Sequence, residues 1–321
     1  MCHNNATCLV GFTDKGYKCV YQAGYKGEHC EKAFKAVFTN LNATGRRGPT
    51  SLGSHYTGQD HDGQVTLISG IQQWTVPYTG DYRIEAIGAA GGYDKHFSSA
   101  QYRGRGARMI GTFRLNKGEV IQIIVGQEGG INKQYSSSGG GGGTFVVRGT
   151  DTPLIIGGGG GGALAVKSRH EGCDASTNTT GNPGYNSWSG GSNGHGAETA
   201  DSGNSGGGGG GFYSSGRSGK NFNGTKGNGG EGGKGFLQGG EGGRSLHHNV
   251  VGGFGGGGGA VGMGAGGGGG GGGGGYSGGS SGDGHRDSCG GGGGSYNDGN
   301  NQDNACCYGT AGHGQVTITL L

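Results

Sequence analysis

A catalytic motif of the phosphoryl-transfer type occurs once in the chain, but its spacing does not fit the chemistry. His285-Arg286-Asp287 reproduces the triplet in which a phosphoryl-transfer loop holds its catalytic base. Such a loop continues with Leu and places a metal-binding Asn seven residues after the His, where this chain has Ser288 and Gly292. The triplet is therefore a chance match, and we expect no enzyme activity from this chain.

Phosphate-binding and zinc-binding patterns are equally incomplete. The segment Gly162 to Lys167 resembles a phosphate-binding loop, but Val166 replaces the glycine that must precede the lysine. A zinc site could be assembled only from scattered residues: His170, Cys173, His285, Cys289 and His313. Solvated histidines and disulfide-bonded cysteines are the ordinary explanation of such residues. We therefore expect neither a metal nor a cofactor.

The composition excludes several classes of protein. The chain has 321 residues with 92 Gly, only 4 Pro and a net charge of +3. Collagen needs Gly at every third position together with abundant Pro, and neither holds here. A net charge this small over this length disfavours a nucleic-acid-binding protein. No apolar run approaches the roughly 18 residues that would span a membrane.

Four cysteines near the start indicate an oxidising compartment. They are Cys2, Cys8, Cys19 and Cys30. The pattern Gly24-Tyr25-x-Gly27-x-x-Cys30 resembles the end of an EGF-like module, and the resemblance covers residues 2–31. Tyr21 stands where that module has its fifth cysteine, and the first would lie upstream of Cys2. The order of bridges in the module implies that Cys2 pairs with Cys19, and that Cys8 and Cys30 are free or paired with each other.

Four further cysteines are expected to form a second, separate set of two bridges: Cys173, Cys289, Cys306 and Cys307. Cys306 and Cys307 are expected not to pair with each other, since a bridge prefers Cα atoms about 5.5–6 Å apart. Four N-x-[ST] sequons agree with an extracellular location, and their asparagines are Asn5, Asn42, Asn178 and Asn223. No signal-peptide pattern follows Met1. We therefore expect the chain to be part of a longer secreted or cell-surface protein.

Alternating apolar and polar residues predict β-strands in the segment 33–156 and at the end of the chain. The alternation occurs over 82–86, 109–115 and 316–320, while the continuous apolar run 120–125 is better buried on both faces. Further candidate strands are 64–69, 72–76, 144–148 and 154–156. No convincing helical period is found. The pattern indicates an antiparallel β-sandwich with Trp74, Tyr82 and Phe113 in its core.

Glycine runs dominate the segment 157–294, and they allow two interpretations. A flexible linker is one, because ordering glycine costs more backbone entropy than ordering any other residue. The other is an array of extended helices with three residues per turn that hydrogen-bond laterally, which only residues without Cβ can form. Phe254, Met263 and Tyr276 would then lie at helix ends or on the outer face of the array. Because Gln315–Leu320 alternates, it needs a sheet and should pair with strands that precede residue 156.

A succession of motifs over about residues 38–321 resembles a known family. It includes Gln73-Trp74-Thr-Val76-Pro77, the segment Gly140 to Val146, and Gly312-His313-Gly314-Gln-Val316. Their order closely resembles the extracellular glycine-rich region of the anaplastic lymphoma kinase and leukocyte tyrosine kinase receptors. The resemblance implies a jelly-roll β-sandwich of the tumour-necrosis-factor type with packed polyglycine helices inserted between its strands. It also implies binding of small secreted cytokine-like ligands and dimerisation, but no ligand-contacting residue can be transferred to this sequence.

These expectations divide the chain into four parts. They are a partial EGF-like module (1–32), the strands of the sandwich (33–156), the glycine-rich insertion (157–294) and a closing segment with the last strand (295–321). The expected function is a non-catalytic extracellular ligand-binding and self-association module of a receptor-like protein. A full-length parent would be a receptor protein-tyrosine kinase, whose membrane span and kinase are absent from this chain. The alternative is a secreted structural or adhesive matrix protein with the same fold, and a pure linker ranks third.

Overall fold

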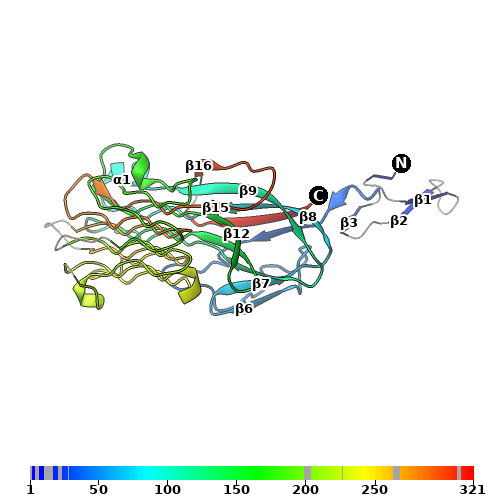
Figure 1. Ribbon diagram of the computed structural model, residues 1–321, viewed down its shortest axis with the longest axis horizontal. Coiled ribbons are helices and arrows are strands. Elements are labelled where there is room, and N and C mark those ends of the chain that lie inside the picture. The colour runs from blue at the N-terminus through cyan, green and yellow to red at the C-terminus, as the bar shows by residue number, and fades with distance from the viewer. Residues whose placement is uncertain are drawn as a thin grey trace.

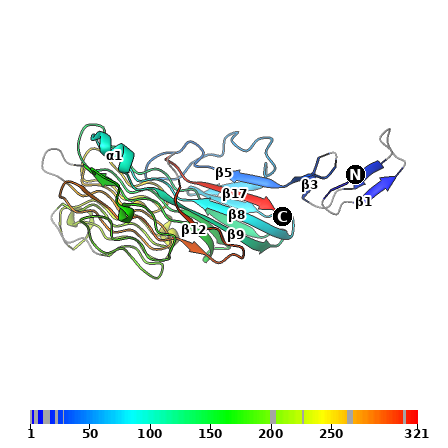
Figure 2. The ribbon, with the colours of Figure 1, turned by 90° about the horizontal axis from the view of Figure 1, so that it is seen from above.

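The computed structural model shows a mainly β protein with three parts along its length (Figure 1). It describes residues 2–3, 7–10, 17–20, 24–27, 29–198, 204–225, 227–262, 268–308 and 312–321. A small head lies at one end, two antiparallel sheets lie in the middle, and the glycine-rich block lies at the other end. The view from above shows the same order (Figure 2). Within the described residues, no helix is long and apolar enough to cross a membrane.

The first sheet has five strands, and the last strand of the chain lies between two earlier ones. Its order is β16 (Ala305–Tyr308), β9 (Gly106–Leu115), β8 (Gly80–Ile87), β17 (Gln315–Leu320) and β5 (Lys35–Phe38). Val316 of β17 lies opposite Ala86 on one side and Phe38 on the other, and all pairs in the sheet are antiparallel. The prediction that Gln315–Leu320 pairs with strands that precede residue 156 is confirmed.

The second sheet has six strands, most of them at predicted positions. Its order is β15 (Tyr296–Asn297), β12 (Thr152–Gly157), β11 (Thr144–Arg148), β10 (Val120–Ile124), β7 (Ile71–Thr75) and β6 (Val65–Ile68). Strands β6 and β7 form a tight hairpin whose two turn residues, Ser69 and Gly70, have φ values of 50° and 83°. Positive φ at both positions matches the right-handed twist of the flanking strands, which explains the glycine.

The two sheets pack face to face over a hydrophobic core to which strands of both contribute. Trp74, Tyr82 and Phe113 lie in this core, as predicted. Phe34 stacks on Trp74 with ring centroids 5.9 Å apart, and the Tyr82 hydroxyl donates a hydrogen bond of 2.7 Å to the Tyr78 carbonyl. Burial raises the pKa of Tyr82 to about 12, so its hydroxyl remains a donor at any physiological pH.

A second core covers the outer face of the six-stranded sheet. Ile121 and Ile123 point into the first core, whereas Ile124 points outward, so the run is buried on both faces from Ile121 on, while Val120 at its start is 42% exposed. Three phenylalanines of the glycine-rich block pack on this outer face: Phe212, Phe236 and Phe254. Phe254 immediately precedes the run 255–259, and its ring is 1% exposed and lies between the block and the sheet, while Met263 lies outside the described residues. We call this second core the phenylalanine core.

The glycine runs of the block lie side by side and are joined by backbone hydrogen bonds. The Gly140 N–H donates to the Gly258 carbonyl (2.9 Å), Gly258 to Gly272 (2.8 Å) and Gly272 to Gly207 (2.9 Å). No described glycine of the runs 157–162, 206–211, 268–275 and 290–294 has a positive φ. A Cβ placed on Gly272 would lie closer than 3.0 Å to a neighbouring carbonyl oxygen. These glycines are therefore needed because they lack a side chain, and not for a left-handed backbone.

The remaining elements are short. Two-stranded pairs are formed by β1 (Thr7–Val10) with β2 (Tyr17–Val20), by β3 (Tyr25–Lys26) with β4 (Lys32–Ala33), and by β13 (Ala163–Leu164) with β14 (Ser288–Cys289). The helix α1 (Phe97–Tyr102) has six residues. Single 3-10 turns occur at η1 (Glu171–Cys173), η2 (Lys220–Phe222) and η3 (Phe236–Gln238).

His61 is a buried titratable residue from which we expect a pH dependence of stability. Its ring is fully buried, with centroids 4.4 Å from the Tyr56 ring and 4.9 Å from the Phe38 ring. Among the described residues, neither ring nitrogen has a hydrogen-bond partner. Burial lowers the pKa of His61 below its ordinary value of 6.5, although Asp60 and Asp62 oppose this. Because the folded state favours the neutral ring, its stabilising contribution is complete above pH 6.5 and is lost as the pH falls below that value.

We therefore expect His61→Phe to flatten the decline of stability on acidification. Urea midpoints measured between pH 7.5 and 4.5 should fall less steeply in the variant than in the parent chain. Burial also lowers the pKa of His313, so part of the slope should remain. His285→Phe is the control, because that side chain is 84% exposed and its pKa is raised by Asp283. Parallel profiles for the parent and His61→Phe would show that His61 does not contribute to the slope.

Candidate functional site

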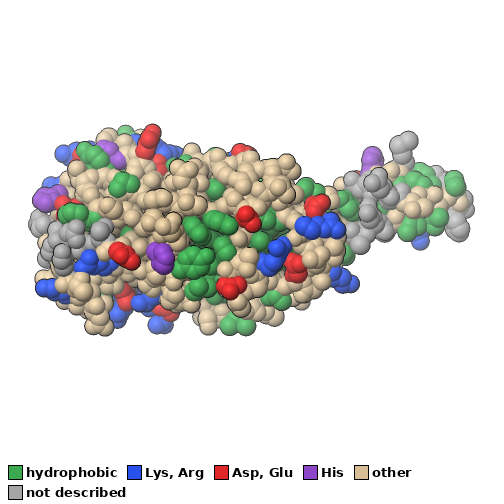
Figure 3. Space-filling model, viewed as in Figure 1, with side chains coloured by type: hydrophobic (Ala, Val, Ile, Leu, Met, Phe, Trp, Pro, Cys, Tyr) green, Lys and Arg blue, Asp and Glu red, His purple; other side chains and the backbone are tan. Residues whose placement is uncertain are grey.

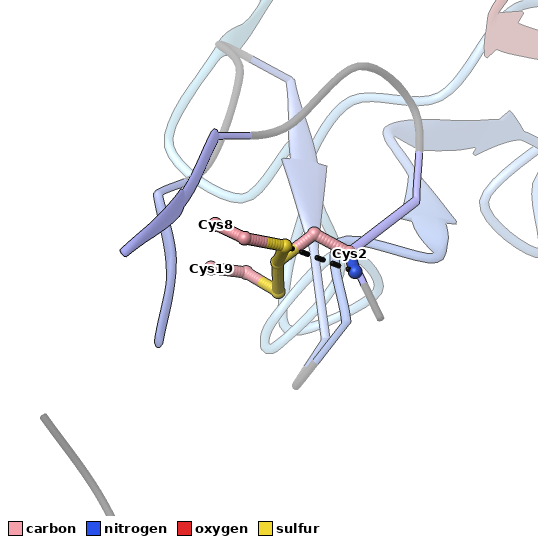
Figure 4. A group of neighbouring side chains, drawn as sticks. All are labelled: Cys2, Cys8 and Cys19. Atoms are coloured by element: carbon pink, nitrogen blue, oxygen red, sulfur yellow. Dashed lines mark hydrogen bonds between the residues drawn. A yellow bond between two sulfur atoms is a disulfide. The ribbon is translucent and has the colours of Figure 1, made fainter. Parts of the chain in front are cut away.

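Three cysteines of the head bring their sulfur atoms together beside the β1–β2 hairpin (Figure 4). Cys8 and Cys19 lie opposite each other in the register of the hairpin, and Cys2 approaches both. The predicted bridge between Cys2 and Cys19 is present. The Cys8 sulfur lies beside this pair. Cys30 is fully buried.

The second set of cysteines forms two bridges, but one of them is not as expected. Cys173 of η1 is bonded to Cys289 of β14 across 116 residues of sequence. Cys306 is bonded to its neighbour Cys307 with Cα atoms 3.0 Å apart, so the prediction that these two do not pair is wrong. The reason lies in the fold: Cys173 and Cys289 bury each other in a small apolar cluster, which leaves the adjacent pair to each other.

The residues considered for zinc have other partners in the structure. Cys173 and Cys289 are joined in their bridge, and His170 stacks on Tyr185 with ring centroids 3.5 Å apart. The ring of His313 accepts a hydrogen bond of 3.0 Å from the Glu128 N–H. Within the described residues, the three head cysteines and the group of Asp174, Cys306 and Cys307 are the sets compact enough to hold an ion. Two cysteines of each set are joined in a bridge, Cys2 with Cys19 and Cys306 with Cys307, which does not suit a ligand set.

Three of the four sequon asparagines are exposed. They are Asn42, Asn178 and Asn223, and Asn5 lies outside the described residues. Asn42 and Asn223 have φ values of 60° and 62°, a left-handed conformation that is common for asparagine in turns. All three can therefore accept a glycan without disturbing either core.

One exposed and two partly buried tyrosines gather where β15 meets the glycine-rich block. Tyr276 stacks on Tyr296 with ring centroids 4.8 Å apart, and Tyr213 packs edge-on against Tyr276 at 6.4 Å. Tyr213 is 41% exposed, and its neighbour Leu237 is 46% exposed. Figure 3 shows hydrophobic side chains gathered in the middle of the face that carries β12 and β15 in Figure 1. We call Tyr213, Tyr276, Tyr296 and Leu237 the tyrosine face.

The tyrosine face is fixed by contacts with the phenylalanine core and by backbone hydrogen bonds. Tyr276 lies 6.4 Å from the buried Phe212 ring, which itself stacks on Phe236 at 5.1 Å in the phenylalanine core. The Phe212 N–H donates to the Tyr276 carbonyl at 2.7 Å, and the Tyr213 N–H donates to the Gly194 carbonyl at 2.8 Å. Aromatic side chains fixed in this way lose little entropy when a partner binds.

The surroundings of Tyr276 and Tyr296 raise the pKa of both phenol groups. Burial raises the pKa of Tyr276, and the neighbouring Tyr213 and Tyr296 raise it further. Burial also raises the pKa of Tyr296, with contributions from Asp298 and Tyr213. The hydroxyls of Tyr276 and Tyr296 therefore stay protonated at physiological pH. Aromatic rings with hydroxyl donors at their rim are typical of the energetically dominant residues of protein–protein interfaces.

Sequence reasoning assigned no ligand-binding residue and did not find this face. A signal was nevertheless present, because each tyrosine closely follows a glycine run. Tyr213 follows the run 206–211, Tyr276 follows 266–275 and Tyr296 follows 290–294. The structure brings the ends of these three runs to one place.

Comparison with known proteins supports a receptor relationship over part of the chain. None of the protein families compared matches it. The chain is 40% identical over 98 residues to the leukocyte tyrosine kinase receptor of Mus musculus. The matched region is 29% of this chain, and it covers 11% of that receptor's length. The identity supports a relation to that family for the matched region.

Proposed function

We propose that this chain is a non-catalytic extracellular module of a receptor-like protein that binds a secreted protein ligand and a second copy of itself. The tyrosine face is the observation that carries the proposal, since it presents three rings from distant segments on a buried, rigid support. The similarity to a receptor over 98 residues supports the receptor assignment. The long-range bridge Cys173–Cys289 and the exposed sequons support an extracellular location.

We extend the proposal to the architecture. The two sheets form a jelly-roll sandwich of the tumour-necrosis-factor type, the glycine runs are polyglycine helices, and the head is a partial EGF-like module. The lateral hydrogen bonds between runs support this, as do two glycines beside the 3-10 turns: Gly219 has φ −67° and ψ 166°, and Gly235 has φ −64° and ψ 163°. These values are close to those of an extended three-residue helix. The proposed divisions of the chain lie after residues 32, 156 and 294.

Tyr213→Ala is expected to weaken binding of a secreted cytokine-like ligand of the receptor family at least about tenfold, because truncating a central interface tyrosine typically costs 2 kcal/mol or more. Surface plasmon resonance with the immobilised chain measures the change. Phe97→Ala is the matched control, since Phe97 is 88% exposed and lies on α1, away from the tyrosine face. Tyr213→Phe separates the ring from its hydroxyl.

Phe97→Ala should melt like the parent, because that side chain is 88% exposed, whereas Tyr213→Ala should melt slightly lower, because the 41% exposed ring packs on Phe212 and Tyr276. Unchanged ligand affinity in Tyr213→Ala would remove the tyrosine face from the proposal. If no ligand of this class binds the parent chain and it remains monomeric at high concentration, the alternative gains: a secreted structural or adhesive matrix protein with the same fold.

A further inference from the structure

A groove of about 430 Å³ lies at the free edge of the six-stranded sheet, away from the tyrosine face. It is lined by Arg47, Thr50, Leu67, Ser69, Glu241 and Phe254. Leu67 belongs to β6, the last strand of that sheet, which lies at the lower margin of the molecule in Figure 1. The groove therefore borders a strand that has a neighbour on one side only.

The free edge of β6 carries backbone groups that face away from its partner strand. The Thr75 N–H donates to the Gln64 carbonyl at 3.0 Å, which makes residues 64 and 75 a hydrogen-bonded pair. Alternation then directs the backbone groups of Thr66 and Ile68 toward β7 and those of Val65 and Leu67 away from it. Among the described residues, no backbone partner is found for the N–H groups of Val65 and Leu67. This edge is open for a further strand.

The segments that line the groove are held by close packing and by backbone hydrogen bonds within the chain. Gly48 and Gly70 approach so closely that a Cβ on either would lie within 3.0 Å of the Cα of the other. The ring of Phe254 lies beneath both glycines, and its N–H donates to the Gly45 carbonyl at 2.8 Å. On the other wall the Gly242 N–H donates to the Arg46 carbonyl at 2.8 Å. A ligand would not have to order these segments when it binds.

The mouth of the groove carries an excess of positive charge. The Arg46 guanidinium lies 2.7 Å from the Glu241 carboxylate and also donates to the Gly242 carbonyl at 3.0 Å. Arg47 shares the same carboxylate only weakly, with 3.8 Å between Nε and the oxygen, and its side chain is 75% exposed. One carboxylate therefore faces two guanidinium groups, and Arg47 is available to a second anion.

We propose that this groove is a second docking site, which takes an extended peptide segment of another protein. The segment adds to β6 as a further antiparallel or parallel strand and bonds to the backbone groups of Val65 and Leu67. An acidic residue of the segment pairs with Arg47, and an apolar neighbour contacts Leu67 and Phe254. Strand addition to an open sheet edge derives affinity from the backbone and specificity from alternate side chains, so the groove selects a short motif.

The probe is a phage-displayed library of random heptapeptides, selected on the full immobilised chain. Enriched peptides should alternate β-branched with polar residues and carry Asp or Glu at a fixed position. Arg47→Glu should weaken a selected peptide at least about tenfold, while Lys117→Glu, an equal charge change at an exposed remote turn, should leave it unchanged. Leu67→Pro should abolish binding, because proline removes an outward N–H without affecting a bond to β7.

Hydrogen exchange gives a readout that does not depend on folding of the variants. Binding of a selected peptide should protect the amides of Val65 and Leu67 and leave that of Thr66 unchanged, since its N–H already faces β7. Selected peptides without an acidic residue, binding that survives Leu67→Pro, or absence of new protection at Val65 and Leu67 would each overturn the proposal. Tyr213→Ala should leave the peptide affinity unchanged, which separates this site from the proposed ligand site. A dimer that dissociates on Leu67→Pro would instead assign the edge to a second copy.

Discussion

Gly272→Ala is expected to lower the free energy of unfolding by about 1–3 kcal/mol, and Gly272→Val by more, because both overpack a closed array. The Gly272 N–H donates to the Gly207 carbonyl, and its own carbonyl accepts the Gly258 N–H at 2.8 Å. An added Cβ would lie closer than 3.0 Å to the carbonyl oxygens of Gly279 and Ser280. Backbone cannot move aside as a flexible side chain can, so neighbouring runs must separate. Urea denaturation followed by tyrosine fluorescence measures the loss.

The control for this prediction is Gly284→Ala. Gly284 also lacks a positive φ, but the nearest atom to its Cβ would be a side-chain carbon of Asn204 at 3.2 Å. Its substitution should change stability by less than about 0.5 kcal/mol. A flexible linker predicts the opposite sign for Gly272→Ala, because alanine restricts the unfolded chain and stabilises by about 0.4–1 kcal/mol. Slow hydrogen exchange of the amides in 269–275 should accompany the loss; fast exchange would favour the linker.

Deleting residues 315–321 is expected to abolish the folded state of the whole chain. Strand β17 is the only bridge between β5 and β8 in the described sheet, and it buries Val316, Ile318 and Leu320. Truncating one buried Ile or Leu costs about 2–5 kcal/mol, whereas an entire domain is stable by about 5–15 kcal/mol. The truncated protein should show no cooperative thermal transition.

Two single substitutions in β17, with different expected costs, test the same prediction. Ile318→Ala should cost about 2–5 kcal/mol and Thr317→Ala less than about 1 kcal/mol, because Ile318 is fully buried while Thr317 is partly exposed. A truncated chain that melts like the parent would contradict the observed topology, and equal effects at positions 317 and 318 would contradict the register of β17.

The strands could be predicted from sequence where one face is buried in a side-chain core. Alternation located β8, β9 and β17, and the predicted segment 144–148 coincides with β11. Short elements were missed because they carry no period: α1 has six residues, and Ser99 contributes by accepting a hydrogen bond of 3.1 Å from the Val166 N–H. The edge strands β15 and β16 lie in Asn-rich sequence that resembles a loop and pair only because the block and β9 place a neighbour beside them.

The candidate site could not be predicted for a different reason. Tyr213 and Tyr296 are separated by most of the glycine-rich block, and their proximity depends on the lateral order of runs that look alike in sequence. The pairing of Cys306 with Cys307 was missed similarly, because it follows from which cysteines the fold buries together. A sequence pattern indicates which side chains of a segment are buried, but it does not indicate which distant segment packs against them.

The hydrogen-bonded glycine runs have a consequence for the uniqueness of the fold. A hydrogen bond between two glycine peptide groups does not distinguish one glycine from another, since every glycine offers the same donor and acceptor. A run displaced along its neighbour would find equivalent bonds, so the array alone encodes many nearly degenerate alignments. Phe212, Phe236 and Phe254 pack on the sheet, and a displaced run would move these large side chains out of their contacts there. The information that selects one alignment is therefore concentrated in a few large side chains, while the cohesion is spread over many small residues.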